Sequence, residues 1–211
     1  MVQGFEITPR KRPTQARAIA TFDAVVEACA RLLPELGYEH LTTNAIAERA
    51  GASIGSLYEY FPGKDAIIAV VVERLVERVM TRLGHDLDEV VQARDRGQLA
   101  PDATIDRWMT RVYEIVAAEG PLVAVLLDQV PYTRQLDILR DLPQRLLEFS
   151  ERGRQAAGVE LAQSTAALTL INNLVSTTIL QVVLDPPSDH AKKAELIAML
   201  TAHVKGLLSR S

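Results

Sequence analysis

Apolar residues recur at intervals of three and four positions along almost the whole chain. The segment from Ala16 to Leu36 shows this spacing most clearly, at Ile19, Phe22, Val26, Cys29, Leu33 and Leu36. Such a period places apolar side chains on one face of an α-helix, whereas a half-buried strand would alternate them. Strand-like alternation is missing from the sequence, which argues against a Rossmann or barrel enzyme. The sequence therefore predicts an all-α fold.

Two short helices are predicted in the stretch "LTTNAIAERAGASIGSLYEYFPG". Thr42 or Thr43 can cap the first helix, which Gly51 terminates. Ser53 can cap the second helix, and a Pro-Gly pair stops it. Two short helices around a tight glycine turn form a helix-turn-helix, although a plain helical hairpin has the same pattern.

The second short helix has a face suited to a DNA major groove. Leu57 and Phe61 are the residues expected to anchor it, and rotation by about 100° per residue turns other side chains outward. Small residues let the backbone approach bases, Ile54 can contact a thymine methyl group, and hydroxyl groups can bind phosphate oxygens. The residues expected on this surface are Thr43, Ser53, Ile54, Gly55, Ser56, Tyr58, Glu59 and Tyr60.

The N-terminal arm is locally basic although the chain carries a net charge of −4. Arg10, Lys11, Arg12 and Arg17 form a cluster with no acidic residue between Ile7 and Phe22. Such a cluster can contact phosphates or enter a minor groove. The alternative is a solvated tail that binds nothing.

The stretch "GYEHLTTNAIAERAGASIGSLYEYFPGKDAI", from Gly37 to Ile67, resembles the DNA-binding signature of the TetR (tetracycline repressor) family. The resemblance implies that Thr43, with Asn44 beside it, and Lys64 contact phosphate. It also implies that residues 53–60 form the recognition helix and that Tyr58 meets the DNA backbone.

Two residues depart from this family pattern. Pro34 stands where the family usually has a helix-forming residue, and Glu59 places a negative charge where a neutral or basic residue is common. Glu59 can accept a hydrogen bond from a cytosine amino group, or it can hold Lys64 or an arm arginine in place. The second use is slightly favoured.

The resemblance also implies a larger C-terminal helical domain that dimerises and holds a small-molecule pocket. The division expected is an arm over 1–13, a DNA-binding domain over 14–75 with its helix-turn-helix at 42–61, and a C-terminal domain over 76–211. Further helices are expected at about 65–83, 102–118, 121–130, 142–157, 162–184 and 189–208, with an irregular connection after residue 83.

The last two predicted helices contain "AALTLINNLVSTTILQVVL" and "AELIAMLTAHVKGLL", which are apolar on more than one side. A helix of this kind must be covered on both faces. We therefore expect a homodimer through these two helices, bound to a palindromic double-stranded operator. The alternative is that both helices are buried in one monomer core.

Residues that combine apolar surface with a few polar groups are candidates for an effector pocket, although each of them also suits plain core packing. A buried amide in an apolar helix needs a partner, which can be a ligand, a neighbouring helix or the other subunit. The candidates are Trp108, Met109, Tyr113, Tyr132, Phe149, Asn172 and Asn173.

Other classes of function find little support in the residues. Cys29 is the single cysteine, which excludes an internal disulfide and a zinc cluster, and its place in an apolar stripe favours a buried, unreactive thiol. Neither metal-ligand spacing nor an activated nucleophile is present, so neither an enzyme nor a cofactor is expected. No secretory signal or membrane span is expected, which favours the cytoplasm.

The function expected is a homodimeric, sequence-specific transcriptional repressor that a small-molecule effector releases from DNA. The alternative is a DNA-binding helical protein without an effector.

Overall fold

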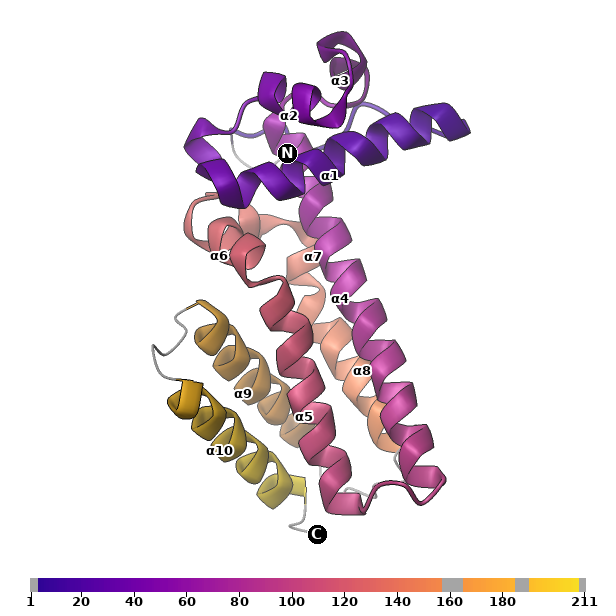
Figure 1. Ribbon diagram of the computed structural model, residues 1–211, viewed down its shortest axis with the longest axis vertical. Helices are drawn as coiled ribbons and strands as arrows, with labels where there is room; N and C mark the ends of the chain where they lie inside the picture. Colours follow the sequence, from indigo (N-terminus) through magenta and orange to yellow (C-terminus); the bar gives the residue numbers. More distant parts are fainter. Residues whose placement is uncertain (1–3, 157–164, 185–189, 209–211) are drawn as a thin grey trace. The chain divides into compact units, whose positions relative to one another are not determined.

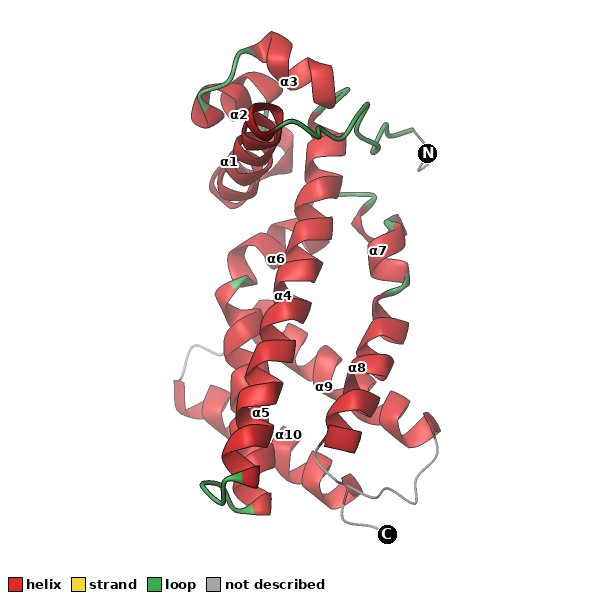
Figure 2. Ribbon diagram, turned by 90° about the vertical axis from the view of Figure 1, so that its right-hand side faces the viewer, coloured by secondary structure: helices red, strands yellow, loops and turns green. Residues whose placement is uncertain are grey.

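The computed structural model describes residues 4–156, 165–184 and 190–208, and every regular element within these ranges is a helix (Figures 1 and 2). The elements are α1 (Ala16–His40), α2 (Thr43–Ala50), α3 (Ile54–Tyr60), α4 (Lys64–Asp95), α5 (Pro101–Ala118), α6 (Gly120–Asp128), the 3₁₀ turn η1 (Thr133–Gln135), α7 (Asp137–Arg140), α8 (Leu142–Ala156), α9 (Thr165–Leu184) and α10 (His190–Leu208). The all-α prediction is confirmed over these residues. Among them, no helix has the length and apolar character needed to cross a membrane.

The chain forms two compact units that are not continuous in sequence. The first unit contains residues 1–77 and 121–140, and the second contains residues 78–120 and 141–211. The segment 121–140 was expected in the C-terminal domain, but it packs with the first unit. Residues 157 and 162–164 of the expected helices, together with residue 189, lie outside the described residues.

Helix α1 supplies one wall of the core of the first unit. Val25, Cys29 and Leu33 are fully buried, whereas Ile19 and Leu36 are each 39% exposed. The expected apolar stripe is therefore right at its centre and wrong at both ends, where fewer neighbours cover the helix. The helix continues through Pro34 and leaves helical geometry at Gly37.

The caps predicted for α2 and α3 are present. The Thr42 hydroxyl accepts a hydrogen bond from the Ala45 amide at 3.1 Å, and Gly51 ends α2 with a φ of 64°. The Ser53 hydroxyl accepts from the Ser56 amide at 3.0 Å at the start of α3. These local bonds fix where both short helices begin and end.

Residues 129–132 pack against the end of α1 in the first unit. The Gln129 side-chain oxygen accepts a hydrogen bond from the Tyr38 amide at 3.0 Å. Gly37 has a φ of 75°, and a Cβ atom there would lie 2.7 Å from the same Gln129 oxygen. Only glycine meets both conditions, because other residues rarely adopt positive φ and would clash here.

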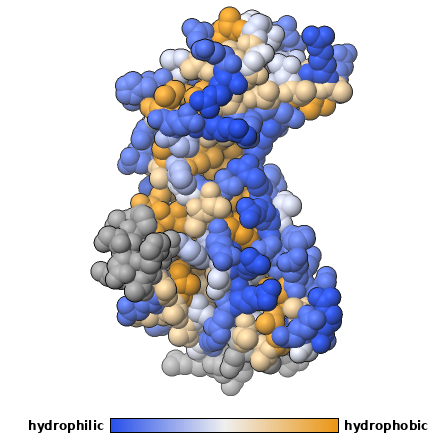
Figure 3. All heavy atoms as spheres, in the orientation of Figure 1, coloured by the Kyte–Doolittle hydropathy of each residue, from blue (hydrophilic) through white to orange (hydrophobic). Residues whose placement is uncertain are grey.

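The second unit is built around two clusters of buried side chains from several helices. One cluster joins Met109 of α5 to residues of α9 and α10, such as Ile179 and Leu200. The other joins Leu83 of α4, Ile115 of α5 and Phe149 of α8. Hydrophilic side chains cover much of the face shown in Figure 3, with apolar residues interspersed.

Helix α4 is longer than predicted, because it continues past residue 83 to Asp95. The polar sequence after Leu83 still contributes Leu87 and Val90 to the buried side of the helix. The helix stops only before Gly97, which has a φ of 70°. The polarity of this segment was thus a poor guide to where the helix ends, since the exposed face of a helix is polar as well.

Replacing Gly51 with alanine should lower the free energy of unfolding by about 1 kcal/mol, because a side chain makes the left-handed conformation unfavourable. Apart from the two neighbours of Gly51 in sequence, no described residue has an atom within 4 Å of the added Cβ, so the cost is conformational rather than steric. Urea-induced unfolding of the full chain measures the change. Gly63→Ala is the matched control, because that site is equally open and lacks a positive φ. Equal losses in both variants would contradict the assignment.

Candidate nucleic-acid interface

The start of α3 presents two serine hydroxyls that are joined to each other. Ser53 Oγ lies 2.8 Å from Ser56 Oγ, and it also caps the helix through the Ser56 amide. Ser53 is exposed and Ser56 is half-buried. Both residues expected at this end of the recognition surface therefore lie together.

Two hydroxyls from different helices meet beside this surface. Thr43 Oγ1 of α2 lies 3.1 Å from the Tyr58 hydroxyl of α3. Tyr58 is 39% exposed, and Asn44, which follows Thr43, is exposed as well. The contact holds the tyrosine ring at a fixed place relative to the first turn of α2.

Ile54 and Gly55 form an apolar and open part of the same helix. Ile54 is 39% exposed, although it is a large hydrophobic residue. A Cβ atom on Gly55 would meet only Ser53 Oγ, at 3.8 Å, and Gly55 does not have a positive φ. None of the described residues requires glycine at this position.

Tyr60 belongs to the core, which corrects its expected place on the recognition surface. It is only 7% exposed, and its ring packs edge-on against Phe22 with centroids 5.9 Å apart. Tyr60 follows Leu57 by three positions, and residues three apart lie close to the same helix face. Phe61 is also buried, stacked on Phe22 at 4.6 Å.

The basic arm lies against α3 and α4 of the first unit. Arg10 donates a side-chain hydrogen bond to the Tyr58 carbonyl at 3.1 Å. Lys11 Nζ lies 3.4 Å from the Glu59 carboxylate, and Arg12 pairs with Glu73 of α4. Glu59 thus holds an arm lysine, not Lys64 or an arm arginine.

Lys64, at the first turn of α4, is held by the end of α1. Its ammonium donates to the Tyr38 carbonyl at 2.6 Å and lies 4.2 Å from the centre of the Tyr38 ring. Lys64 is half-buried, so only part of this cation faces solvent.

Tyr38, Asp65 and Tyr132 form a hydrogen-bonded network that no pattern in the sequence indicates. The Tyr38 hydroxyl donates to Asp65 Oδ1 at 2.9 Å, and the Tyr132 hydroxyl donates to the same oxygen at 3.0 Å. Tyr132 was expected in an effector pocket, but it is fully buried in the first unit. Burial, reinforced by Asp65, raises the pKa of both phenols well above the ordinary value.

Most of the expected effector residues are packed within the second unit. Met109 and Phe149 are buried in its two clusters, and Trp108 packs against both clusters. Tyr113 is half-buried beside Met109, and it has an interaction partner.

The two asparagines of α9 differ. Asn172 Oδ1 accepts from the Ser150 hydroxyl at 2.6 Å, so its partner is the neighbouring helix α8. Its side-chain amide also lies 3.4 Å from the Leu146 carbonyl of α8. Asn173 is exposed.

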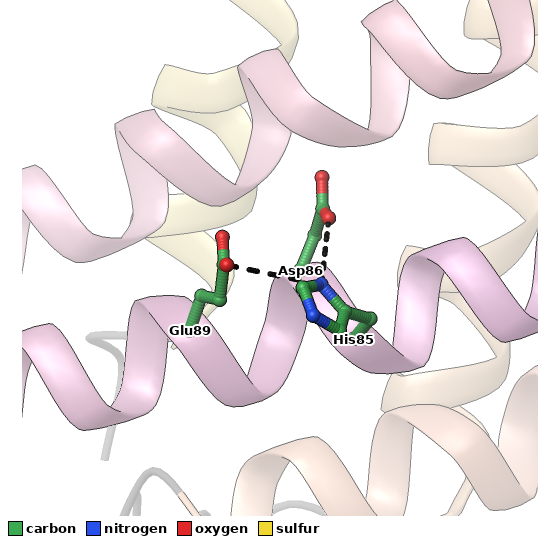
Figure 4. A group of neighbouring side chains, drawn as sticks. All are labelled: His85, Asp86 and Glu89. Carbon is green, nitrogen blue, oxygen red and sulfur yellow. Dashed lines mark ion pairs between the residues drawn. The ribbon is translucent and has the colours of Figure 1, made fainter.

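Two remaining groups of titratable side chains have ordinary explanations. His85, Asp86 and Glu89 lie together on α4 (Figure 4), with Nδ1 of His85 3.5 Å from Asp86 and 3.9 Å from Glu89. This is a solvent-exposed cluster on one helix turn, and Arg111 lies 3.9 Å from the Asp86 carboxylate. Burial raises the pKa of the Cys29 thiol to about 12, which leaves it protonated and unreactive.

Two capped short helices, a glycine turn and an exposed, partly apolar second helix define a helix-turn-helix domain of the DNA-binding kind. Residues 25–71 match the family model described as "Bacterial regulatory proteins, tetR family". These residues form a TetR-family DNA-binding domain, which confirms the resemblance seen in the sequence.

Two curated relatives match about half of this chain. The HTH-type transcriptional repressor KstR of Rhodococcus jostii is 29% identical over 122 residues, which cover 50% of this chain and 55% of the relative. The A-factor receptor protein of Streptomyces griseus is 31% identical over 107 residues, which cover 50% and 38% of the two chains. The aligned part therefore spans about half, or less, of these relatives.

A solved structure from Mesorhizobium loti, described as a TetR-family transcriptional regulator, resembles most of this chain. It gives a TM-score of 0.70 with 15% identity, covering 92% of this chain and 98% of the other. At this identity the match establishes a shared fold.

Tyr38 and Tyr132 should ionise at higher pH than the phenols of the unfolded chain, because burial and Asp65 disfavour both phenolates. These phenols ionise first in the unfolded chain, so their stabilisation is complete below about pH 10 and is lost as the pH rises further. Near-ultraviolet phenolate absorbance measures the titration. The part of the absorbance change that occurs at the highest pH should shrink in Tyr38→Phe and Tyr132→Phe. It should persist in Tyr58→Phe, because Tyr58 lies outside the network. A loss of this part only in Tyr58→Phe would contradict the network.

Proposed function

We propose that the protein is a transcriptional regulator that reads a double-stranded DNA operator with α3. The observation that carries this proposal is the outward face of α3, where Ile54 and Gly55 are exposed beside the joined hydroxyls of Thr43 and Tyr58. This face belongs to a TetR-family domain over residues 25–71. Such a regulator acts on the chromosome, in the cytoplasm.

Base contacts are proposed for the first turn of α3. The exposed Ile54 side chain can meet a thymine methyl group, and Gly55 lets the helix backbone approach the groove. Among the described residues, a Cβ atom on Gly55 would make only an ordinary contact with Ser53 Oγ, at 3.8 Å, so the approach of a partner is a reason for glycine there. Ser53 and Ser56 add hydroxyls that can donate to either bases or phosphates.

Phosphate contacts are proposed on either side of this turn. Thr43 and Tyr58 share a hydrogen bond of 3.1 Å, so one phosphate oxygen can be approached by both hydroxyls. Asn44 is exposed next to Thr43, and Lys64 adds a cation at the start of α4. Tyr60, being buried, is left out of the proposed contacts.

A homodimer is proposed to form through α9 and α10. Leu170 of α9 is 59% exposed and Met199 of α10 is 52% exposed, which is unusual for large hydrophobic residues. The exposed residues near Met199 on this helix are the small Ala198 and Ala202 and the polar Glu195 and His203. Covering both helices with a second copy would form a four-helix interface. Two recognition helices would then meet half-sites about 34 Å apart, or a multiple of it.

Release by a small-molecule effector is proposed for the repressor. Support comes from the two relatives, one of which is described as a repressor and the other as a receptor. An effector that prefers a conformation unable to bind DNA would lower operator affinity by population shift. Helix α4 is the proposed lever, because its residues contribute to both units.

DNA binding without an effector is the second candidate, and one observation favours it. Met109 and Phe149 are buried in packed clusters, and the Asn172 side chain is already bonded within the second unit. Trp108 is the only tryptophan and packs against both clusters, so its fluorescence reports on this region. A compound that releases operator DNA and changes this fluorescence supports an effector. Release with unchanged fluorescence contradicts a site at these clusters.

Selection of bound DNA from a random pool should enrich a palindromic site. On that site, Tyr58→Phe should weaken binding about equally for all sequences, because it removes a phosphate contact. Ile54→Ala should instead cost roughly 1 kcal/mol mainly at one thymine-containing position. Fluorescence anisotropy with single-base variants of the site measures both effects. Failure to enrich any palindrome, or sequence-selective loss in Tyr58→Phe, would contradict these roles.

Replacing Leu170 or Met199 with glutamate should shift the protein from dimer to monomer, because the change buries a charge in the proposed interface. Light scattering coupled to size-exclusion chromatography measures the mass. Leu36→Glu is the matched control, since Leu36 is an exposed apolar residue of the first unit. A mass that stays dimeric in both variants and in their double mutant would contradict the proposed interface.

A further inference from the structure

The N-terminal segment Phe5–Arg12, called the strap below, lies along the first unit as an extended chain. Phe5, Ile7 and Pro9 are half-buried, and the residues between them, Glu6 and Thr8, are exposed. This alternation is the pattern of an extended segment with one face against a surface. A free tail would not bury every second residue.

The strap is bonded to the last turn of α3 where that helix lacks donors of its own. The Tyr58 carbonyl would ordinarily accept from the amide four residues later, but that residue is Pro62, which has no N–H. The Arg10 guanidinium donates to the Tyr58 carbonyl at 3.1 Å. The Arg10 amide donates to the Tyr60 carbonyl at 2.7 Å. One residue of the strap thus satisfies two carbonyls at the helix end.

One charge pair, one cation–π contact and one contact between aromatic rings hold the strap on either side of Arg10. Lys11 lies 3.4 Å from Glu59 and 5.2 Å from the centre of the Tyr60 ring. At the other end, the Phe5 ring packs on Tyr132 with centroids 4.8 Å apart. The strap therefore connects α3 to the segment that contains Tyr132, within one compact unit.

We infer that the strap positions the recognition helix, with Phe5 as its anchor and Arg10 as the group that fixes the end of α3. Glu59 then serves the strap by holding Lys11 and does not read a base. This inference rests on the proposed function, since it concerns the helix proposed to contact DNA. It differs from direct phosphate binding by the arm, because an uncharged residue, Phe5, takes part.

Amide hydrogen exchange in the free protein tests whether the strap is docked. The Arg10 amide should exchange slowly, because it is bonded to Tyr60, and Phe5→Ala should speed its exchange by about tenfold. Leu36→Ala is the matched control, since it trims an exposed apolar side chain of the same unit and should leave the Arg10 amide unchanged. Fast exchange in the wild-type protein, or equal exchange in both variants, would overturn the docking.

Operator affinity over a range of salt concentrations tests the positioning role. Phe5→Ala should weaken binding by about threefold to tenfold and leave the salt dependence unchanged, because no charge is lost. Lys11→Gln should change the salt slope no more than Arg31→Gln, whose arginine sits in a similar exposed pair with Glu27.

Two results would overturn the positioning role. The first is that Phe5→Ala binds the operator with wild-type affinity. The second is that the slope of operator affinity against salt concentration falls by about one in Lys11→Gln and not in Arg31→Gln, which would indicate direct phosphate contact by Lys11. If the selection from a random pool enriches no DNA site, the proposed function is contradicted, whereas the docking of the strap is not. The exchange of the Arg10 amide still decides whether the strap is docked.

Discussion

Helix α3 has seven residues, and a helix of this length is not stable by itself in water. Its conformation therefore depends on the residues against which it is buried. Leu57 and Phe61 are completely buried, and Phe61 stacks on Phe22 of α1. Because the buried side of α3 is fixed by this packing, the opposite side can carry residues that this packing does not require, such as Ile54, which is 39% exposed.

Besides the packing of α3 on α1, the network of Tyr38, Asp65 and Tyr132 joins distant segments of the first unit. Two phenols donate to one carboxylate oxygen, and the Tyr38 carbonyl accepts from Lys64. The start of α4 is thus tied to the end of α1 and to a residue nearly seventy positions further along the chain. Tyr132 is thus linked to Lys64 through Asp65 and Tyr38 by hydrogen bonds within this unit.

Features that depend on neighbouring residues could be predicted from the sequence, and those that depend on distant contacts could not. The caps at Thr42 and Ser53 follow from local chemistry, so the bounds of α2 and α3 were predicted to within a residue or so. The partners of Asp65 and Gln129 come from far along the chain, and no periodicity signals them. Tyr60 was misplaced although its three-residue spacing from Leu57 already indicated the buried face.

The position of residues 121–140 has a practical consequence for anyone who wants the DNA-binding part alone. A fragment that ends at residue 77 would lose Gln129 and Tyr132, leaving the Tyr38 amide and the Asp65 carboxylate without these partners. It would also expose Phe5, which packs on Tyr132. We therefore expect that a self-sufficient form of this domain is not an N-terminal fragment but a shortened chain in which residues 121–140 are rejoined to residues 1–77.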